Sequence, residues 1–282
     1  MLSIVRDIER TLVRLRSGRL RIHIPRPVGL YRKIPRSFFH ATPEVFIQTG
    51  GGTDFECPGG SFRLEAWDVC VMPAGVPHIE TPVDLATPYG ILVCMQARDG
   101  LLVHRAAASE RREIVAIRAE HLPTGRGRAA FRYLEEMSAP VPEKHRRGYL
   151  RCLLEAFFIT TIGELQKPTF RNDTRSPLVT EAEKLARALL TDPDLSVVRL
   201  AASLGCSADY LSRRFQREMG QTLTGWLTRE RVALARDLLT DPRRSVSEVA
   251  WMCGFSTPSY FIRVFRQQTG LTPRAWRTSA AG

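Results

Sequence analysis

The last third of the chain contains two stretches that repeat one pattern, LAASLGCSADYLSRRFQREMGQT at 200–222 and VAWMCGFSTPSYFIRVFRQQTGLTP at 249–273. In each stretch an alanine precedes a glycine by four residues, and a serine, an aromatic–apolar pair, an arginine, a phenylalanine and a second glycine follow. The offset between copies is 49 residues at Gly205 and Gly254 and 50 residues at Phe215 and Phe265. One residue is therefore inserted in the second copy, within its second helix or at the entry to that helix.

Each part of the repeated pattern has a physical reason. The alanine lets two helices cross closely, and the glycine ends the first helix with a positive φ. A serine, Ser207 or Ser256, caps the second helix. The pair Tyr210–Leu211 or Tyr260–Phe261 buries the inner face of that helix, and the polar residues and the arginine face outward. This is the pattern of a helix-turn-helix, whose second helix enters the major groove of DNA.

The segment between the two copies predicts a connecting helix. From Thr224 to Thr240, apolar residues form one stripe, which consists of Leu227, Leu234, Ala235, Leu238 and Leu239. About 17 helical residues span about 25 Å. A helix of this length can hold two recognition helices on one face of a duplex, aimed at major grooves that lie about 34 Å apart.

Capping boxes predict where two further helices begin. Thr180 is followed three residues later by Glu183, and Ser245 by Glu248. In such a box the hydroxyl and the carboxylate each satisfy a backbone N–H that the helix leaves unpaired. We therefore expect a helix to start at each of these two positions.

Residues 178–277 resemble the DNA-binding domain of the AraC/XylS family of transcription regulators, and GFSTPSYFIRVFRQQTGLTPRAWR at 254–277 is similar to the family signature nearly residue for residue. The resemblance implies seven helices, two helix-turn-helix units and a bipartite promoter site. It also implies activation of transcription as the usual role. We therefore expect a regulator rather than an enzyme, with double-stranded DNA and RNA polymerase as partners.

The outward positions of the two recognition helices are the candidate base readers. The resemblance implies base contacts there, and arginine can bind guanine O6 and N7 with two hydrogen bonds. For the two arginines the alternative is a phosphate contact or a surface ion pair. Asp209 is not counted, because an acid repels phosphate and can accept only from cytosine N4. Ile262 is a candidate for contact with a thymine methyl group. The predicted DNA-binding residues are Ser212, Arg213, Thr257, Ser259 and Arg263.

Composition limits the remaining classes of function. Lys and Arg number 41 against 29 Asp and Glu, which gives a net charge of +12, and 44% of residues are hydrophobic. This balance allows a packed core and favours a polyanionic partner, either nucleic acid or an anionic membrane. No apolar run approaches the roughly 20 residues of a membrane helix, and the N-terminus lacks the apolar centre of a signal peptide. We expect a soluble, cytoplasmic protein without membrane contact.

In the N-terminal part the spacing of apolar residues changes twice. Residues 4–15 have helical apolar spacing in a basic segment, which predicts an amphipathic arm packed on its own domain or on a dimer partner, the alternative being an arm that touches DNA or membrane. From 19 to 100, short apolar stretches alternate with Gly, Pro and Asp, which predicts a small β-barrel or sandwich. From 108 to 167 the period is helical. The resemblance implies homodimer helices there, with packing on the chain's own barrel as the alternative, and the expected contacts are Leu150, Leu153, Leu154 and Phe158.

Two stretches, HATPEVFIQTGG at 40–51 and EAWDVCVMPAGVPH at 65–78, resemble the two motifs of the cupin barrel. Phe38 stands where the first histidine of the motif is expected, and three possible metal ligands remain, His40, Glu44 and His78. Such a set can hold Fe(II) or another divalent ion. We expect no cofactor, and instead a small-molecule effector inside the barrel. The candidate effector-binding residues are Phe46, Phe62, Trp67, Met72 and His78.

The predicted architecture is α+β, with an N-terminal small cupin-like β-barrel, two following helices and a C-terminal all-α domain with two helix-turn-helix units. The predicted boundaries are 1–107 for the arm and barrel, 108–167 for the dimerisation helices, 168–177 for a linker and 178–282 for the DNA-binding domain. The preferred function is an effector-responsive transcription regulator. The alternatives are a metal-dependent cupin enzyme fused to a DNA-binding domain, and a nucleoid-type binder without ligand.

Overall fold

A computed structural model of the chain describes residues 2–26, 37–38, 40–84, 86–110, 113–137, 139–167 and 175–280. Contacts divide the chain into an N-terminal unit, Met1–Ser37 with Thr42–Asp173, and a C-terminal unit, Phe38–Ala41 with Thr174–Gly282. None of the helices in these described ranges is both long and apolar enough to cross a membrane.

The N-terminal unit contains two β-sheets. The strand order is β1-β5-β2-β7-β8-β9 in the larger sheet and β4-β3-β6 in the smaller one. β1 pairs with β5 in parallel, and the other pairs are antiparallel. The strands are β1 Ile22–His23, β2 Glu44–Gly50, β3 Thr53–Cys57, β4 Gly60–Leu64, β5 Val69–Met72, β6 Ile79–Pro82, β7 Gly90–Ala97, β8 Gly100–Ala108 and β9 Ile114–Leu122.

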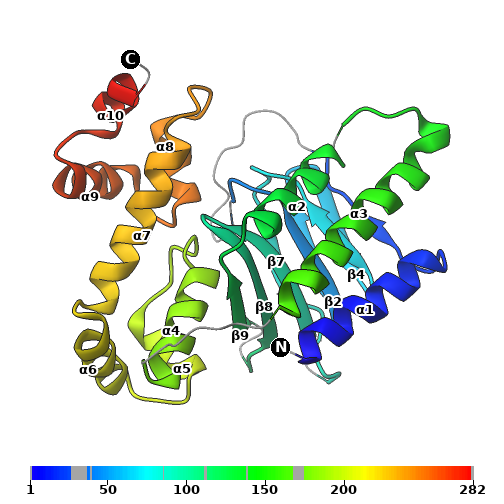
Figure 1. The fold of residues 1–282 in the computed structure, drawn as a ribbon, viewed down its shortest axis with the longest axis horizontal. Coiled ribbons are helices and arrows are strands. Elements are labelled where there is room, and N and C mark those ends of the chain that lie inside the picture. The colour runs from blue at the N-terminus through cyan, green and yellow to red at the C-terminus, as the bar shows by residue number, and fades with distance from the viewer. Residues whose placement is uncertain are drawn as a thin grey trace. The chain divides into compact units, whose positions relative to one another are not determined.

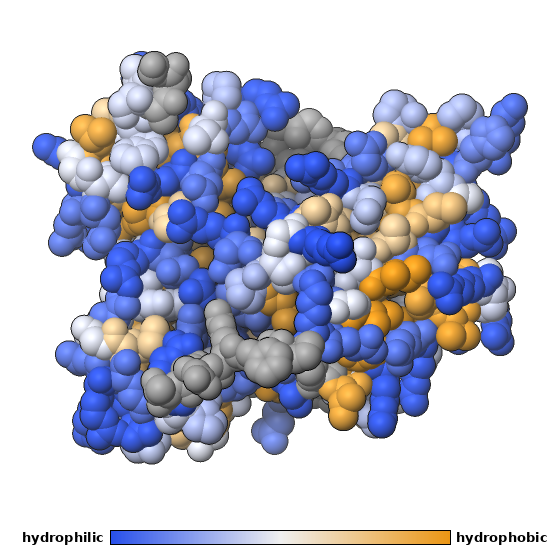
Figure 2. Space-filling model, viewed as in Figure 1, coloured by the Kyte–Doolittle hydropathy of each residue, from blue (hydrophilic) through white to orange (hydrophobic). Residues whose placement is uncertain are grey.

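Three helices cover one face of the larger sheet, α1 Leu2–Arg16, α2 Gly125–Glu136 and α3 Glu143–Leu165 (Figure 1). Side chains alternate along a strand, so Val45 and Ile47 of β2 pack under these helices, while Glu44 and Phe46 point to the opposite face. Figure 2 shows apolar residues among hydrophilic ones over α1 and α3. This arrangement leaves the second face of the sheet as the place for a polar cluster.

The predicted basic arm is a helix that packs on its own unit. In α1 the buried apolar residues join the core formed by α2, α3 and the larger sheet, and Asp7 pairs with Arg105 of β8. An amphipathic helix of this kind is stabilised by burial of its apolar stripe. Of the alternatives that the sequence left open, packing on its own domain is the one that the structure contains. The buried apolar residues of α1 are Ile4, Val5, Ile8, Leu12 and Leu15.

The α+β architecture agrees with the prediction. The sequence left a barrel or a sandwich open for the N-terminal part, and within the described residues the strands form two sheets that are not closed into one barrel. The helical period does not begin at residue 108, because Ile114–Leu122 is strand β9 and pairs with β8. The apolar residues of this stretch suit either a helix or a strand. Pairing with β8 makes the stretch a strand. The two helices that follow, α2 and α3, agree with the prediction.

The C-terminal unit contains seven helices in its described residues, in agreement with the resemblance. They are α4 Pro177–Ala188, α5 Val197–Ser203, α6 Ala208–Met219, α7 Leu223–Leu238, α8 Val246–Met252, α9 Pro258–Thr269 and α10 Pro273–Ala280. Figure 1 shows α6 and α9 at opposite ends of the long helix α7. The predicted connecting helix is therefore present, with 16 residues.

Only one of the two predicted capping boxes begins a helix in the structure. Ser245 and Glu248 form the box as predicted and begin α8. The box at Thr180 is wrong, because Ser176 caps α4 and Thr180 lies inside that helix. Of the predicted linker 168–177, residues 168–174 lie outside the described residues, and Ser176 and Pro177 already belong to the start of α4.

Candidate functional site

The turn between the two helices of each motif depends on a glycine with positive φ. In the first copy Gly205 has φ +66°, and the Ser207 hydroxyl accepts a hydrogen bond of 3.3 Å from the Tyr210 N–H. In the second copy Gly254 has φ +76°. The cap there is Thr257, not Ser256 as predicted, and its hydroxyl accepts from the Tyr260 N–H at 3.3 Å.

The displaced cap shows where the second copy carries its extra residue. Ser207 follows Gly205 by two residues, whereas Thr257 follows Gly254 by three. The insertion therefore lies in the turn rather than in the recognition helix. The turn also buries Phe255 against Phe261, with their ring centroids 5.0 Å apart.

The inner faces of the recognition helices are apolar, with one difference from the prediction. Leu211 and Phe261 are buried, but Tyr210 and Tyr260 are 47% and 43% exposed. Only the second member of each aromatic–apolar pair therefore faces the core. The guanidinium of Arg263 lies over the Tyr260 ring, 5.2 Å from its centroid, so this tyrosine shapes the outer surface.

The predicted DNA-binding residues lie on the outer surface of the two motifs. Arg213, Ser259 and Arg263 are exposed and Ser212 is half-buried. Thr257 is exposed, but its hydroxyl is engaged as the cap of α9. All five residues are thus at least partly exposed to solvent. Thr257 lies at the start of α9 rather than in its middle.

Further outward residues, which are not among the predicted ones, lie one turn further along each recognition helix. Gln216 and Arg217 on α6, and Arg266 and Gln267 on α9, are exposed. They follow the predicted arginines by three or four residues, the spacing of neighbours on one helix face, which was the signal available in the sequence. On α9 these residues border a shallow hollow, which is lined by Ser259, Ile262, Arg263, Arg266, Gln267, Gly270 and Thr272.

A pair of arginines holds the two motifs in the same way. Arg231 donates from Nε and Nη2 to the backbone oxygens of Leu190 and Asp192, at 2.8 and 2.7 Å. Arg277 donates from the same atoms to the backbone oxygens of Leu239 and Arg244, at 3.1 and 2.7 Å. Each arginine comes from the helix after a recognition helix and fixes the segment before the motif.

A second contact also occurs twice. The Arg187 guanidinium lies 5.0 Å from the ring centroid of Trp226, and that of Arg236 lies 4.4 Å from Trp276. The arginines come from α4 and α7, and the tryptophans from α7 and α10. The internal repeat is therefore longer than the motif, and α7 closes the first copy and opens the second.

The second face of the larger sheet in the N-terminal unit carries a buried polar cluster. His78 Nε2 lies 3.7 Å from Glu44 Oε2 and 3.4 Å from Glu80 Oε1. Burial raises the pKa of Glu44 to about 8, although His78 counteracts it. Burial by itself would lower the pKa of His78, but the hydrogen bond to Glu80 and the charges of Glu44 and Glu80 raise it. The cluster combines two carboxyl groups with one imidazole.

Aromatic rings surround this cluster, and two of them belong to predicted effector-binding residues. Phe46 contacts His78 edge-on at 5.6 Å, and Phe62 stacks on Phe55 at 5.2 Å. Met72 is buried opposite Glu44 in the pairing of β5 with β2. Phe46, Phe62, Met72 and His78 are thus gathered in one part of the unit.

Trp67, the fifth predicted effector-binding residue, lies elsewhere. It occupies the turn between β4 and β5 with φ +73°, and its N–H donates to the Gln48 oxygen at 2.6 Å. Its ring packs against Arg10 of α1 at 5.9 Å. The structure therefore does not bring Trp67 together with the other four candidate residues.

Two of the three candidate metal ligands, Glu44 and His78, belong to the N-terminal unit. Glu44 and His78 lie in the cluster of the N-terminal unit, together with Glu80, which the sequence analysis missed. His40 lies in Phe38–Ala41, which groups with the C-terminal unit, where its Nδ1 lies 3.0 Å from the Thr191 hydroxyl. Within the N-terminal unit the donor set is therefore one imidazole and two carboxylates, which are ligand types that divalent ions accept.

Two of the predicted dimer contacts lie inside the N-terminal unit. Leu154 and Phe158 are completely buried in the core with α1 and the larger sheet, and Leu150 and Leu153 are partly buried against it. The prediction is wrong for Leu154 and Phe158, because the broad apolar stripe of α3 packs on its own sheet. The exposed apolar residues on these helices are Tyr133 and Ile159, which border a hollow between α2 and α3.

Comparisons with known proteins agree with this geometry. Residues 200–279 match a family described as a helix-turn-helix domain. The HTH-type transcriptional activator RhaR of Escherichia coli (strain K12) is 31% identical over 138 residues, which cover 44% of this chain and 46% of that protein. The chain thus spans about half the length of the curated relatives that it matches.

Solved structures with similarity to the chain cover a little more than a third of it. The C-terminal domain of AraT, a response regulator from Geobacillus stearothermophilus, is 29% identical and covers 38% of this chain and 88% of that chain, with a TM-score of 0.37. The DNA-binding domain of AdpA, a global transcriptional factor solved in complex with a target DNA, is 35% identical and covers 37% of this chain and 93% of that chain, with a TM-score of 0.35.

The C-terminal unit is a helix-turn-helix DNA-binding domain. This follows from the match over residues 200–279, together with the two exposed recognition helices. With the sequence identity to an activator of transcription, it confirms the resemblance given above: the unit is a DNA-binding domain of the AraC/XylS type.

Proposed function

We propose that the protein is a sequence-specific transcription regulator, an activator, whose action depends on a small molecule bound in the N-terminal unit. The observation that carries the proposal is the presence of two exposed recognition helices, α6 and α9, on one repeated scaffold. A single helix α7 of 16 residues, or about 24 Å, joins them. A helix of this length can hold two recognition helices against neighbouring major grooves, which lie about 34 Å apart.

Base reading is assigned to the outer faces of α6 and α9. Arg213 and Arg263 bind guanine in their respective half-sites, because two parallel hydrogen bonds to O6 and N7 distinguish guanine from the other bases. The half-exposed Ile262 supplies an apolar surface for a thymine methyl group. Ser212, Thr257 and Ser259 contact base edges or neighbouring phosphates, since hydroxyl groups can do either.

Selection from a random pool of duplex DNA tests this proposal. The full-length protein is expected to enrich a bipartite sequence with two half-sites about one helical turn apart. Enrichment of no sequence, with binding that depends only on salt, would identify the nucleoid-type binder instead.

The buried cluster of the N-terminal unit is the proposed place of effector binding. Phe46, Phe62 and Met72 supply apolar walls, and His78 with Glu44 and Glu80 supplies polar groups, the usual combination in small-molecule sites. A ligand can change the DNA-bound state only when it binds one state more tightly than the other. Thermal-shift screening of the full chain against small metabolites tests this, since a ligand of the folded state raises its apparent stability.

The protein acts in the cytoplasm as a homodimer that recruits RNA polymerase. The exposed residues Tyr133 and Ile159 mark the face of α2 and α3 through which the dimer forms. Ile159→Asp introduces a charge there and is expected to yield monomers in sedimentation, whereas a dimer of unchanged mass would exclude this face.

A metal-dependent cupin enzyme is the second candidate, and the donor set around His78 is the observation that favours it. Glu44, His78 and Glu80 would hold the ion, which would act as a Lewis acid for its substrate. Metal analysis of the purified protein decides between the candidates. The enzyme requires a stoichiometric ion that the Glu44→Ala variant loses.

A further inference from the structure

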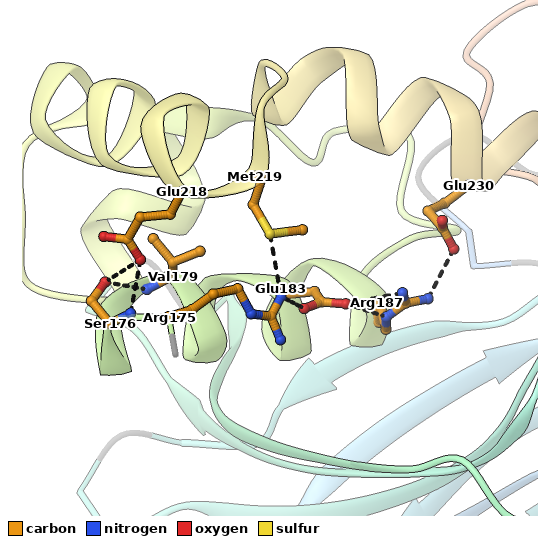
Figure 3. Close-up of polar contacts among 8 residues, drawn as sticks. All are labelled: Arg175, Ser176, Val179, Glu183, Arg187, Glu218, Met219 and Glu230. Carbon is orange, nitrogen blue, oxygen red and sulfur yellow. Dashed lines mark hydrogen bonds and ion pairs between the residues drawn. The ribbon is translucent and has the colours of Figure 1, made fainter. Parts of the chain in front are cut away.

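The chain enters the C-terminal unit at a point that is bonded directly to a recognition helix. Ser176, the cap of α4, donates its backbone N–H and its hydroxyl to the same oxygen of Glu218, at 2.8 and 2.9 Å. Glu218 lies in the last turn of α6, and Figure 3 shows its carboxylate directed at Ser176. Its other oxygen lies 2.8 Å from Nη2 of Arg214, one turn earlier in α6.

The neighbouring residue strengthens this connection. Arg175 pairs with Glu183 of α4, and its Nη1 lies 3.2 Å from the sulfur of Met219, the residue after Glu218 (Figure 3). Glu183 also pairs with Arg187 at 3.0 Å, and Arg187 reaches Glu230 of α7 at 2.8 Å. A continuous set of polar contacts thus runs from residues 175–176 to both α6 and α7.

The electrostatics are consistent with this arrangement. The backbone N–H of Ser176 holds the pKa of Glu218 below its usual range, against a smaller effect of burial. Burial opposes the ionised form of Glu183, but the hydrogen bonds from Arg175 and Arg187 outweigh it and lower its pKa. Both carboxylates are therefore ionised at neutral pH, the form in which a carboxyl group accepts its strongest hydrogen bonds.

The second copy of the repeat has a different arrangement at the same place. At the offset of the recognition helices, Gln268 of α9 corresponds to Glu218, and it is exposed. The counterpart of α4 in the second copy is the second half of α7, which continues from its own first half and has no helix start to be held. The connection to an entering segment therefore belongs to α6.

We propose that Glu218 is a positioning residue that ties the entry of the chain into the C-terminal unit to recognition helix α6, so that the entering segment controls reading of the α6 half-site. The inference rests on the proposed function and deepens it, because it names the half-site through which regulation acts. Glu218 takes its contacts from Ser176 and Arg214 and acts through the placement of α6. The α9 half-site is read independently of this connection.

The test uses the full-length chain and three duplexes made from the selected operator: the intact site, the site with its α6 half replaced, and the site with its α9 half replaced. Glu218→Ala removes two hydrogen bonds to a charged group, and we expect about tenfold weaker binding to the two duplexes that keep the α6 half. Binding to the duplex without it is expected to stay unchanged. Fluorescence anisotropy at one salt concentration gives the three affinities.

Two further variants separate positioning from general stability. Gln268→Ala, the matched change on α9, is expected to leave all three affinities unchanged. Glu218→Gln keeps an oxygen that can accept both hydrogen bonds from Ser176, and we expect it to restore most of the affinity. Thermal unfolding of each variant is recorded alongside.

The outcomes are distinguishable. Equal losses on all three duplexes, or unchanged binding by Glu218→Ala, would overturn the inference while leaving the proposed function intact. Failure of the unaltered protein to select any operator would instead overturn the proposed function. Should Glu218→Ala fail to fold, Ser176→Ala still decides, because it must weaken binding to the α6 half-site alone.

Discussion

The two helix-turn-helix copies share their internal contacts and differ where they meet solvent and the rest of the chain. Arg231 and Arg277 each bind two backbone oxygens, and Trp226 and Trp276 each pack under an arginine. The outward residues differ, with Asp209 in one copy where Ser259 stands in the other. The repeat therefore preserves a scaffold, while the reading surface and its attachments are separate for each copy.

The sharpest contrast within the scaffold is at the two glycines of the turns. A Cβ atom at Gly254 would lie 2.6 Å from the Leu190 oxygen, whereas one at Gly205 meets nothing within 4 Å. Both have positive φ. Gly205→Ala is expected to lose about 1–2 kcal/mol of unfolding free energy from the backbone conformation alone.

For Gly254→Ala the clash with backbone adds to that cost, and we expect a loss of about 4 kcal/mol or more. Urea unfolding of both variants, followed by tryptophan fluorescence, measures the two effects. Equal losses would mean that the turns are equivalent and that the contact of the second turn with Leu190 is not tight.

The shared arginines provide the next test. Arg231→Ala leaves two backbone oxygens without their donors in a buried place, and we expect a loss of about 2–3 kcal/mol in unfolding free energy. Arg277→Ala is expected to cost a similar amount, because it also leaves two backbone oxygens without their donors. Lysine at either position is expected to restore little, since one ammonium group cannot bind both oxygens with the geometry of a guanidinium. Full rescue by lysine would show that charge, not geometry, matters here.

Base reading can be compared in the same way. Arg213→Ala and Arg263→Ala are each expected to weaken specific binding by about 1–3 kcal/mol and to relax one base position, in different half-sites. Selection with each variant, followed by anisotropy on the enriched sequence, measures both effects. A loss of the same size on random DNA would assign the arginine to phosphate contact.

The smallest expected effect concerns the acid at the start of α6. Asp209→Ser gives the first copy the residue of the second, and removal of one negative charge near the phosphates should tighten binding to random duplex by about 0.5 kcal/mol. Ser259→Asp should weaken it by a similar amount. Affinities that do not change with either exchange would place these positions outside the DNA surface.

Much of the C-terminal unit could be predicted because its signals are local. Gly205, Gly254 and the Ser245–Glu248 box each specify a short-range geometry, and the structure agrees at all three. Thr180 and Glu183 satisfy the same box pattern and yet lie inside α4. The earlier Ser176 wins because a proline follows it and fits the first turn of a helix.

The N-terminal unit was harder to predict because its geometry depends on long-range pairing. Strand β9 has apolar residues that suit a helix, and only its pairing with β8 reveals it as a strand. Leu154 and Phe158 look available for a partner from their spacing, and only packing on the sheet shows that they are used internally. Glu80 could not be predicted from the sequence, because it lies near Glu44 and His78 only when the two sheets pack together.

Helix α7 fixes both the distance and the rotation between the recognition helices α6 and α9. Because it ends one copy and begins the next without interruption, one added residue would rotate α9 by about 100° relative to α6 and move it by about 1.5 Å. An insertion or deletion in helix α7 therefore could not compensate for a change of one base pair in the spacing of the operator. Under the proposed function, new operators therefore arise by base substitutions within each half-site, while the spacing between the two half-sites stays constant.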